Sequence, residues 1–128
     1  MEGTKTVILC DTDILIELYK NNPVIISELR KIGSKQIAIS SITQAELYYG
    51  ALNKQELLKI KKHLSQLEIL LVDRTVSEQF IQLMENYALS HKLAIPDAII
   101  AATALVNNLD LYTLNQKDFR FISNLNLY

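Results

Sequence analysis

The chain has 128 residues and a formal net charge of −1, from 13 lysines and arginines against 14 aspartates and glutamates. Hydrophobic residues make up 49% and charged residues 21%, a globular composition that excludes disorder as the main state. This length predicts one compact domain over residues 1–128. The near-neutral charge excludes a strongly basic protein, so a polyanionic partner would have to be recognised by a local site.

Cysteine usage and hydropathy favour the cytoplasm. Cys10 is the only cysteine, so it cannot form an internal disulfide, and it ends an apolar run in which we expect it to be buried. The N-terminus lacks the long apolar segment of a signal peptide, and no apolar run reaches the roughly 18 residues that span a bilayer. We therefore expect a cytoplasmic protein with no membrane association.

The chain begins with a predicted strand and two predicted helices. The apolar run over residues 6–10 predicts a buried parallel strand that ends at Asp11. A first helix is expected from about Ile14 to Lys20, where asparagines and a proline end it. A second helix is expected over residues 23–32, because proline suits a first helical turn and a glycine follows the last one.

A second strand is predicted over residues 36–40, followed by an apolar helix that reaches Leu52. Ser41 is the predicted N-cap of this helix, because Gln44 lies three residues later as in a capping box. The helix after Asn53 carries one apolar stripe, formed by Leu57, Ile60, Leu64 and Leu67. We interpret its basic run as a solvated helix face rather than a nucleic-acid patch; the run comprises Lys54, Lys59, Lys61 and Lys62.

The second half of the chain repeats the alternation of strands and helices. A third strand is predicted over residues 68–73, an amphipathic helix over 76–92 and an almost wholly apolar helix over 96–106. A fourth strand is predicted over 110–113 and a short fifth over 125–128. The pattern predicts a three-layer α/β/α fold with a central, largely parallel sheet of four to five strands. Ligands of such folds bind at the carboxyl ends of the strands, near a reversal of strand order.

Polar residues that can form a site gather at these strand ends and at the helix starts that face them. They are Asp11, Asp13, Glu46, Asp97, Asn115 and Asp118. Three of them also have purely structural explanations. Asp13 can be a helix N-cap, Asp97 can be favoured by the helix macrodipole, and Asp118 can be a turn residue.

Glu46 is harder to explain by structure alone, because it lies in an apolar helix where an unpaired charge is costly. Carboxylates that converge on one pocket raise one another's pKa unless a cation lies between them. Oxygen ligands of this kind suit Mg²⁺ or Mn²⁺. Zinc is not expected, because His63 and His91 lack ligand spacing and lie in predicted amphipathic helices, where structural or surface roles are expected.

Four segments, in this order and spacing, resemble the signature segments of the PIN-domain ribonucleases, and most of all the VapC-type toxins of toxin–antitoxin pairs. The segments are VILCDTDILIELY (7–19), SITQAELYYGAL (41–52), IPDAIIAATAL (95–105) and LYTLNQKDF (111–119). The resemblance covers nearly the whole chain and implies a single PIN domain. Its most specific parts surround Asp11, Glu46 and Asp97.

The resemblance also assigns roles to residues. It implies that Asp11, Glu46 and Asp97 are catalytic and hold a divalent metal, Mg²⁺ or Mn²⁺. The family varies at the fourth acidic position, which we assign to Asp118, with Asn115 as the other candidate. The other polar residues are expected to support the site rather than to hold the metal. Asp13 is expected to have an orienting role, and Thr12 and Thr113 can form hydrogen bonds to carboxylate or phosphate.

The function implied is metal-dependent hydrolysis of RNA phosphodiester bonds by the toxin of a toxin–antitoxin pair. Proteins similar to this one usually form homodimers and are inhibited by a cognate antitoxin, whose C-terminal segment enters the active-site groove. Two alternatives stay open. Asp11, Thr12 and Asp13 after an apolar strand resemble the Asp-x-Asp motif of haloacid dehalogenase-like phosphatases, although that family's later motifs are not recognisable. The other alternative is a catalytically silent PIN-like module that binds RNA or a partner.

Overall fold

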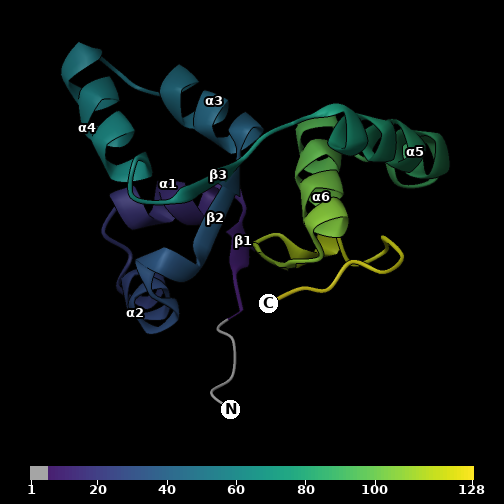
Figure 1. Ribbon diagram of the computed structural model, residues 1–128, viewed down its shortest axis with the longest axis horizontal. Coiled ribbons are helices and arrows are strands. Elements are labelled where there is room, and N and C mark those ends of the chain that lie inside the picture. The colour runs from purple at the N-terminus through teal and green to yellow at the C-terminus, as the bar shows by residue number, and fades with distance from the viewer. Residues whose placement is uncertain (1–5) are drawn as a thin grey trace.

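The computed structural model describes residues 6–128 (Figure 1). Its central sheet has four strands: β1 (Ile8–Cys10), β2 (Ile37–Ser40), β3 (Glu68–Leu70) and β4 (Asp110–Tyr112). The strand order is β3-β2-β1-β4, and every neighbouring pair is parallel. All four strands therefore present their carboxyl ends at the same edge of the sheet.

Helices cover both faces of this sheet. They are α1 (Thr12–Tyr19), α2 (Pro23–Ile32), α3 (Ser41–Tyr49), α4 (Lys54–Leu64), α5 (Arg74–His91) and α6 (Ile95–Asn107), with short 3-10 turns η1 (Ser34–Gln36) and η2 (Gln116–Asp118). Figure 1 shows α1, α2 and α4 on one side of the strands and the packed pair α5 and α6 on the other. The three-layer α/β/α architecture predicted from the sequence is confirmed.

The two faces of the sheet bury different cores. On β1, Leu9 packs into the core formed with α5 and α6, whereas Cys10 packs into the core formed with α1, α2 and α4. On β2, Ala38 faces the first core, and Ile37 and Ile39 face the second. Burial on both faces explains why these strands read as continuous apolar runs. Cys10 is buried as predicted, and its burial raises the pKa of the thiol to about 12.

Four helices begin earlier than the sequence predicts, and they are α1 at Thr12, α3 at Ser41, α5 at Arg74 and α6 at Ile95. α1 begins at Thr12 rather than near residue 14, since the Asp11 carboxylate accepts a hydrogen bond from the Thr12 amide. The expectation that Ser41 caps α3 is wrong. Ser40 is the N-cap, and its hydroxyl accepts a hydrogen bond from the Ile42 amide. Only Asp11 therefore separates β1 from α1, and β2 passes directly into α3.

The strands differ from prediction at the two ends of the sheet. β3 ends at Leu70 rather than at residue 73, because the chain turns so that Asp73 can cap α5. The fifth strand, predicted over 125–128, is reduced to one parallel bridge between Leu111 and Leu127. A left-handed residue, Asn124, turns the chain just before it, which leaves too few residues for a ladder.

The helix α4 agrees with its predicted amphipathic pattern. Ile60 and Leu64 are buried, while the four lysines of the basic run are exposed to solvent. Within residues 6–128, no helix has the length and apolar character needed to cross a membrane.

Strand order fixes where a site can form. The chain runs from β1 outward through β2 to β3, and then crosses to β4 on the other side of β1. The order therefore reverses between β1 and β4, and a crevice is expected at their carboxyl ends. The Asp11 amide donates a 2.9 Å hydrogen bond to the Tyr112 carbonyl, which ties these two ends together.

Candidate active site

Asp11 lies where the strand order reverses between β1 and β4, and both of its carboxylate oxygens accept hydrogen bonds. Its Oδ1 accepts the Thr12 amide proton at 2.7 Å, and its Oδ2 accepts the Thr113 hydroxyl proton at 2.8 Å. Thr113 comes directly after β4, so the pairing of β1 with β4 brings the two residues together. Asp11 is only 5% exposed, and its side chain has a fixed orientation.

Asp13 holds the segment that follows β4. Its Oδ2 accepts hydrogen bonds from the Leu114 amide at 3.1 Å and from the Asn115 side-chain amide at 2.9 Å. The Asn115 main-chain amide donates to the Thr113 hydroxyl at 3.0 Å. The other oxygen of Asp13, Oδ1, is buried and has no hydrogen-bond partner. Asp13 therefore orients the loop before η2 and still has one unsatisfied carboxylate oxygen.

Glu46 reaches the same edge of the sheet from α3, which begins directly after β2. Its Oε1 lies 2.6 Å from the Thr12 hydroxyl, and that hydroxyl oxygen lies 2.9 Å from the hydroxyl of Thr43. Thr43 is fully buried and lies three residues before Glu46, on the same side of the helix. Thr43 is not predicted from the sequence as a site residue, although its position one helical turn before Glu46 is a signal that could have indicated it.

Asp97 and Asp118 complete the group. Asp97 lies in the first turn of α6 and is partly buried, and Asp118 ends η2 and is exposed. The pKa of Asp97 is raised to about 6, first by burial and then by the negative charges of Asp118, Glu46 and Asp13. The charges of Asp118, Glu46 and Asp13 therefore act on Asp97.

The pKa of Asp11 is raised to about 7, first by burial and then by the charges of Asp13 and Asp97, against the lowering effect of its hydrogen bonds. Burial also raises the pKa of Asp13. The structure thus brings together the four predicted acids with Asp13. We refer to this group as the site carboxylates: Asp11, Asp13, Glu46, Asp97 and Asp118.

The site carboxylates have the properties of an oxygen-ligand set for a hard divalent cation. The ion pairs found among residues 6–128 involve none of them, so no lysine or arginine neutralises their charge there. The raised pKa values and the buried, unpartnered Oδ1 of Asp13 are features that a cation would relieve. Over the same residues, no three acidic, histidine or cysteine side chains converge tightly enough to enclose an ion alone. Mg²⁺ does not need such an enclosure, because it keeps several waters and binds through one or two carboxylates.

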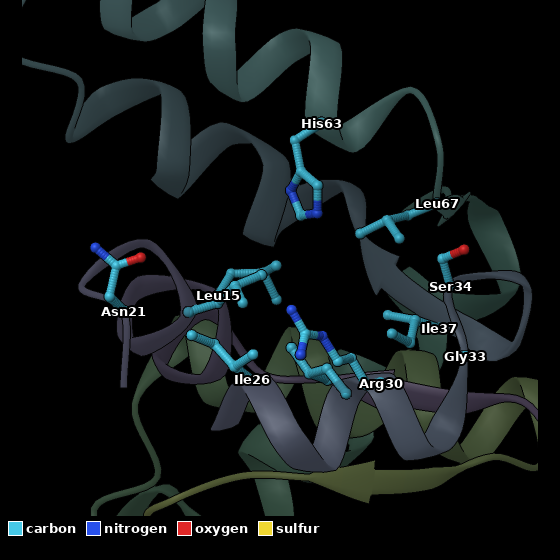
Figure 2. Close-up of a pocket in the computed structure, with 11 residues that line it drawn as sticks. Leu15, Asn21, Ile26, Arg30, Gly33, Ser34, Ile37, His63 and Leu67 are labelled. Atoms are coloured by element: carbon cyan, nitrogen blue, oxygen red, sulfur yellow. The ribbon is translucent and has the colours of Figure 1, made fainter. Parts of the chain in front are cut away.

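The two histidines lie in amphipathic helices, as the sequence predicts. His63 of α4 lies 2.8 Å from the Tyr19 hydroxyl and, with Arg30 of α2, points into a cavity of about 550 Å³ (Figure 2). His91 at the end of α5 stacks on Phe121 with ring centroids 4.1 Å apart.

A second hollow of about 740 Å³ begins at the site itself. Its lining runs from Glu46 along α1, α3 and α4, and includes the apolar residues Ile16, Tyr19, Leu47, Leu52 and Ile60. This groove connects the acidic site to an apolar surface large enough for a ligand to contact both.

Comparison with known proteins identifies similar sequences. The model of the PIN domain family matches residues 8–124. The ribonuclease VapC1 of Methanocaldococcus jannaschii is 32% identical over 99% of this chain and 89% of its own length. The tRNA(fMet)-specific endonuclease VapC of Shigella flexneri is 29% identical over 91% of this chain and 92% of its own length.

Solved structures are similar over the same extent. A toxin-antitoxin complex from Klebsiella pneumoniae contains a chain that is 35% identical, with a TM-score of 0.79, over 92% of this chain and 94% of that one. A DNA-bound VapBC from Salmonella typhimurium contains a chain that is 27% identical, with a TM-score of 0.85, over 96% of this chain and 97% of that one.

Neither these similarities nor the geometry supports the phosphatase alternative. That chemistry needs Asp11 as an accessible nucleophile, yet Asp11 is buried and both of its oxygens accept hydrogen bonds. It also needs Asp13 as a general acid, whereas Oδ2 of Asp13 accepts hydrogen bonds from the loop after β4 and Oδ1 is buried.

Proposed function

The chain belongs to the PIN-domain family and, within it, to the VapC ribonucleases, and from that premise we propose that it hydrolyses RNA as the toxin of a toxin–antitoxin pair. The observation that carries the proposal is the acidic edge of the sheet, where Thr12 bonds both Asp11 and Glu46. The charges of Asp118 and Glu46 also act on Asp97 at the start of α6. Such a cluster, next to a groove, suits hydrolysis of a phosphodiester.

We assign Asp11, Glu46, Asp97 and Asp118 as the residues that hold a divalent cation, Mg²⁺ or Mn²⁺. A cation bound there supplies the Lewis acid that polarises the scissile phosphate and lowers the pKa of a water molecule. Asp118 is preferred to Asn115 as the fourth residue, because its charge acts on Asp97 while the Asn115 side chain is bonded to Asp13.

The chain's own hydrogen bonds prepare the site for this chemistry. The Thr113 hydroxyl and the Thr12 amide fix the two oxygens of Asp11, and Asp13 fixes the loop that leads to Asp118. No side chain has to form a covalent intermediate. Water would attack the phosphorus while the bond to the 3′ oxygen breaks, and the 3′ oxygen would leave with a proton, which gives a 5′ phosphate and a 3′ hydroxyl.

An antitoxin is the proposed protein partner, since several similar solved structures are toxin–antitoxin complexes. The groove that begins at Glu46 offers a place for its C-terminal segment, with an acidic end and an apolar wall. We also propose a homodimer, which light scattering would test, and a cytoplasmic location, where cellular RNA is the substrate.

The first prediction tests the activity. The purified protein is incubated with a labelled RNA in Mn²⁺, in Mg²⁺ and in EDTA, beside the Asp11→Asn variant and the matched control Asp73→Asn. Asp73 caps α5, and asparagine is an equally good cap, so this control should remain active. Cleavage should require metal and fall at least about a hundredfold in Asp11→Asn, because a ligand to the cation is lost.

The product ends test the mechanism in the same samples, and 5′ phosphate with 3′ hydroxyl is expected. Cleavage that persists in EDTA, or that is unchanged in Asp11→Asn, would contradict a metal-dependent site. An intact protein that neither binds metal nor cleaves any RNA would instead identify a catalytically silent module.

A further inference from the structure

We propose that Thr12 is a positioning residue for Glu46, and that Thr43 supports it through a buried pair of hydroxyl groups. The proposal rests on the proposed function, because it concerns the same carboxylate site. It assigns a role to two threonines that lie on different helices and are 31 residues apart in the chain.

Thr12 contacts two site carboxylates at once. Its main-chain amide donates to Oδ1 of Asp11 at 2.7 Å, and its side-chain Oγ1 lies 2.6 Å from Oε1 of Glu46. Thr12 occupies the first turn of α1, so the same residue joins the end of β1 to the second turn of α3. With 9% exposure, its side chain has little access to water that could replace these contacts.

The available protons define the direction of the hydrogen bonds. A threonine hydroxyl has one proton to donate and two lone pairs to accept. A carboxylate is the stronger acceptor, and the 2.6 Å distance is typical of a hydroxyl bonded to a charged oxygen, so Thr12 donates to Glu46. Thr43 then donates to Thr12 over 2.9 Å, which also satisfies a hydroxyl on a residue with no exposure.

This chain of hydrogen bonds matters because Glu46 would otherwise be free to turn away. Its side chain is only partly buried, and it is repelled by the neighbouring charge of Asp97. A hydrogen bond to Oε1 holds the carboxylate at the edge of the sheet and leaves Oε2 for a cation. Groups that orient a metal ligand in this way affect metal affinity although they do not touch the metal.

Two substitutions of similar size separate the hydroxyl from the shape of the side chain. Thr12→Val removes the hydroxyl and keeps the branched side chain, whereas Thr12→Ser keeps the hydroxyl. We expect the dissociation constant for Mn²⁺, measured by calorimetry, to rise about tenfold or more in Thr12→Val and to stay within about threefold in Thr12→Ser. Thr103→Val, which removes another buried hydroxyl in α6, serves as the control for a general effect and should bind Mn²⁺ like the wild type.

A double-mutant cycle with Glu46→Met, which removes the acceptor oxygen and keeps a side chain of similar length, tests whether Thr12 acts through Glu46. In the Glu46→Met background, Thr12→Val should change neither Mn²⁺ affinity nor kcat further. Equal effects of Thr12→Val in both backgrounds, or unchanged Mn²⁺ affinity in the single variant, would overturn the proposal.

The same cycle, measured by denaturant unfolding in EDTA, separates this proposal from the proposed function. Energetic coupling between Thr12→Val and Glu46→Met is expected without metal, because the hydrogen bond exists in the metal-free protein. Absence of that coupling would overturn the positioning role even if the protein cleaves RNA. If coupling is present but the wild type neither binds Mn²⁺ nor cleaves RNA, the proposed function fails and the hydrogen bond stands.

Discussion

Asp11 combines three roles that oppose one another: it caps α1, it is buried, and it lies beside other negative charges. The folded protein raises its pKa from 3.8 to about 7, chiefly by burial and next by the charge of Asp13. A raised pKa means that the protonated side chain is favoured in the folded state. The stability linked to this group is therefore fully present below pH 3.8 and is lost as the pH rises through 7.

The second prediction follows from this sign. In EDTA, Asp11→Asn removes a charge that the folded state disfavours, and asparagine can still accept the Thr12 amide proton. The quantity compared is the free energy of unfolding of Asp11→Asn minus that of the wild type. This difference should be larger at pH 8 than at pH 5 by about 2 kcal/mol. Denaturant titration at both pH values measures this difference, with Asp73→Asn as the control. The same relative stability at pH 5 and pH 8 would refute the electrostatic account.

For single residues, the sequence predicts which acids belong to the site but not the hydrogen bonds that fix their side chains. Asp11 and Glu46 are recognisable because each follows a strand or interrupts an apolar helix. Their partners are not, because the bonds from Thr113 to Asp11 and from Thr12 to Glu46 join residues 102 and 34 positions apart. Such contacts depend on strand register and on side-chain rotamers, which no local pattern encodes.

Among the elements, the loop between β4 and η2 depends most on a single side chain. Asp13 accepts hydrogen bonds from Leu114 and Asn115, and this loop leads to Asp118. Because the loop is exposed, few apolar contacts are available to replace these bonds.

The third prediction concerns this loop. Asp13→Ala should increase the exchange rate of the Leu114 amide hydrogen about tenfold, because the amide loses a charged acceptor. Asp13→Asn keeps an acceptor oxygen and should retain most of the protection, which makes it the matched control. Exchange measured by NMR at one pH compares the three proteins. Equal protection in Asp13→Ala and wild type would show that the loop is held by other contacts.

Local patterns predict which side of a helix is buried, but not the residue at which the helix begins or a strand ends. The apolar stripe of α4 predicted its buried side, because amphipathic spacing needs no tertiary information. α1 begins two residues early, since Asp11 serves both as its cap and as a site carboxylate. The segment 125–128 has strand-like composition but forms one bridge, because the turn before it limits pairing.

For the whole molecule, the sequence predicts the sheet from alternating elements, but not its strand order. The order β3-β2-β1-β4 depends on which side of β1 the last strand takes, and that choice creates the crevice beside Asp11.

The near-neutral net charge is the sum of an acidic site and a mildly basic remainder of the chain. Removing the four negative charges of Asp11, Glu46, Asp97 and Asp118 changes the formal charge from −1 to +3.

The fourth prediction concerns how an acidic site in a mildly basic chain binds RNA. The site carboxylates repel phosphate unless a cation is bound, so RNA affinity should depend on metal more than on surface lysines. Ca²⁺, which binds carboxylates at longer distances than Mg²⁺, serves as a probe of binding rather than cleavage. Fluorescence anisotropy with a short labelled RNA should give at least about tenfold tighter binding in Ca²⁺ than in EDTA.

The matched test uses the lysines of α4, which are exposed on the face opposite its buried stripe. Lys61→Glu with Lys62→Glu reverses two charges without touching the site carboxylates. If that basic run is only a solvated helix face, this double variant should bind RNA within about threefold of wild type and keep its response to Ca²⁺. A larger loss, together with equal wild-type affinity in Ca²⁺ and EDTA, would mean that the surface of α4 and not the acidic crevice directs RNA binding.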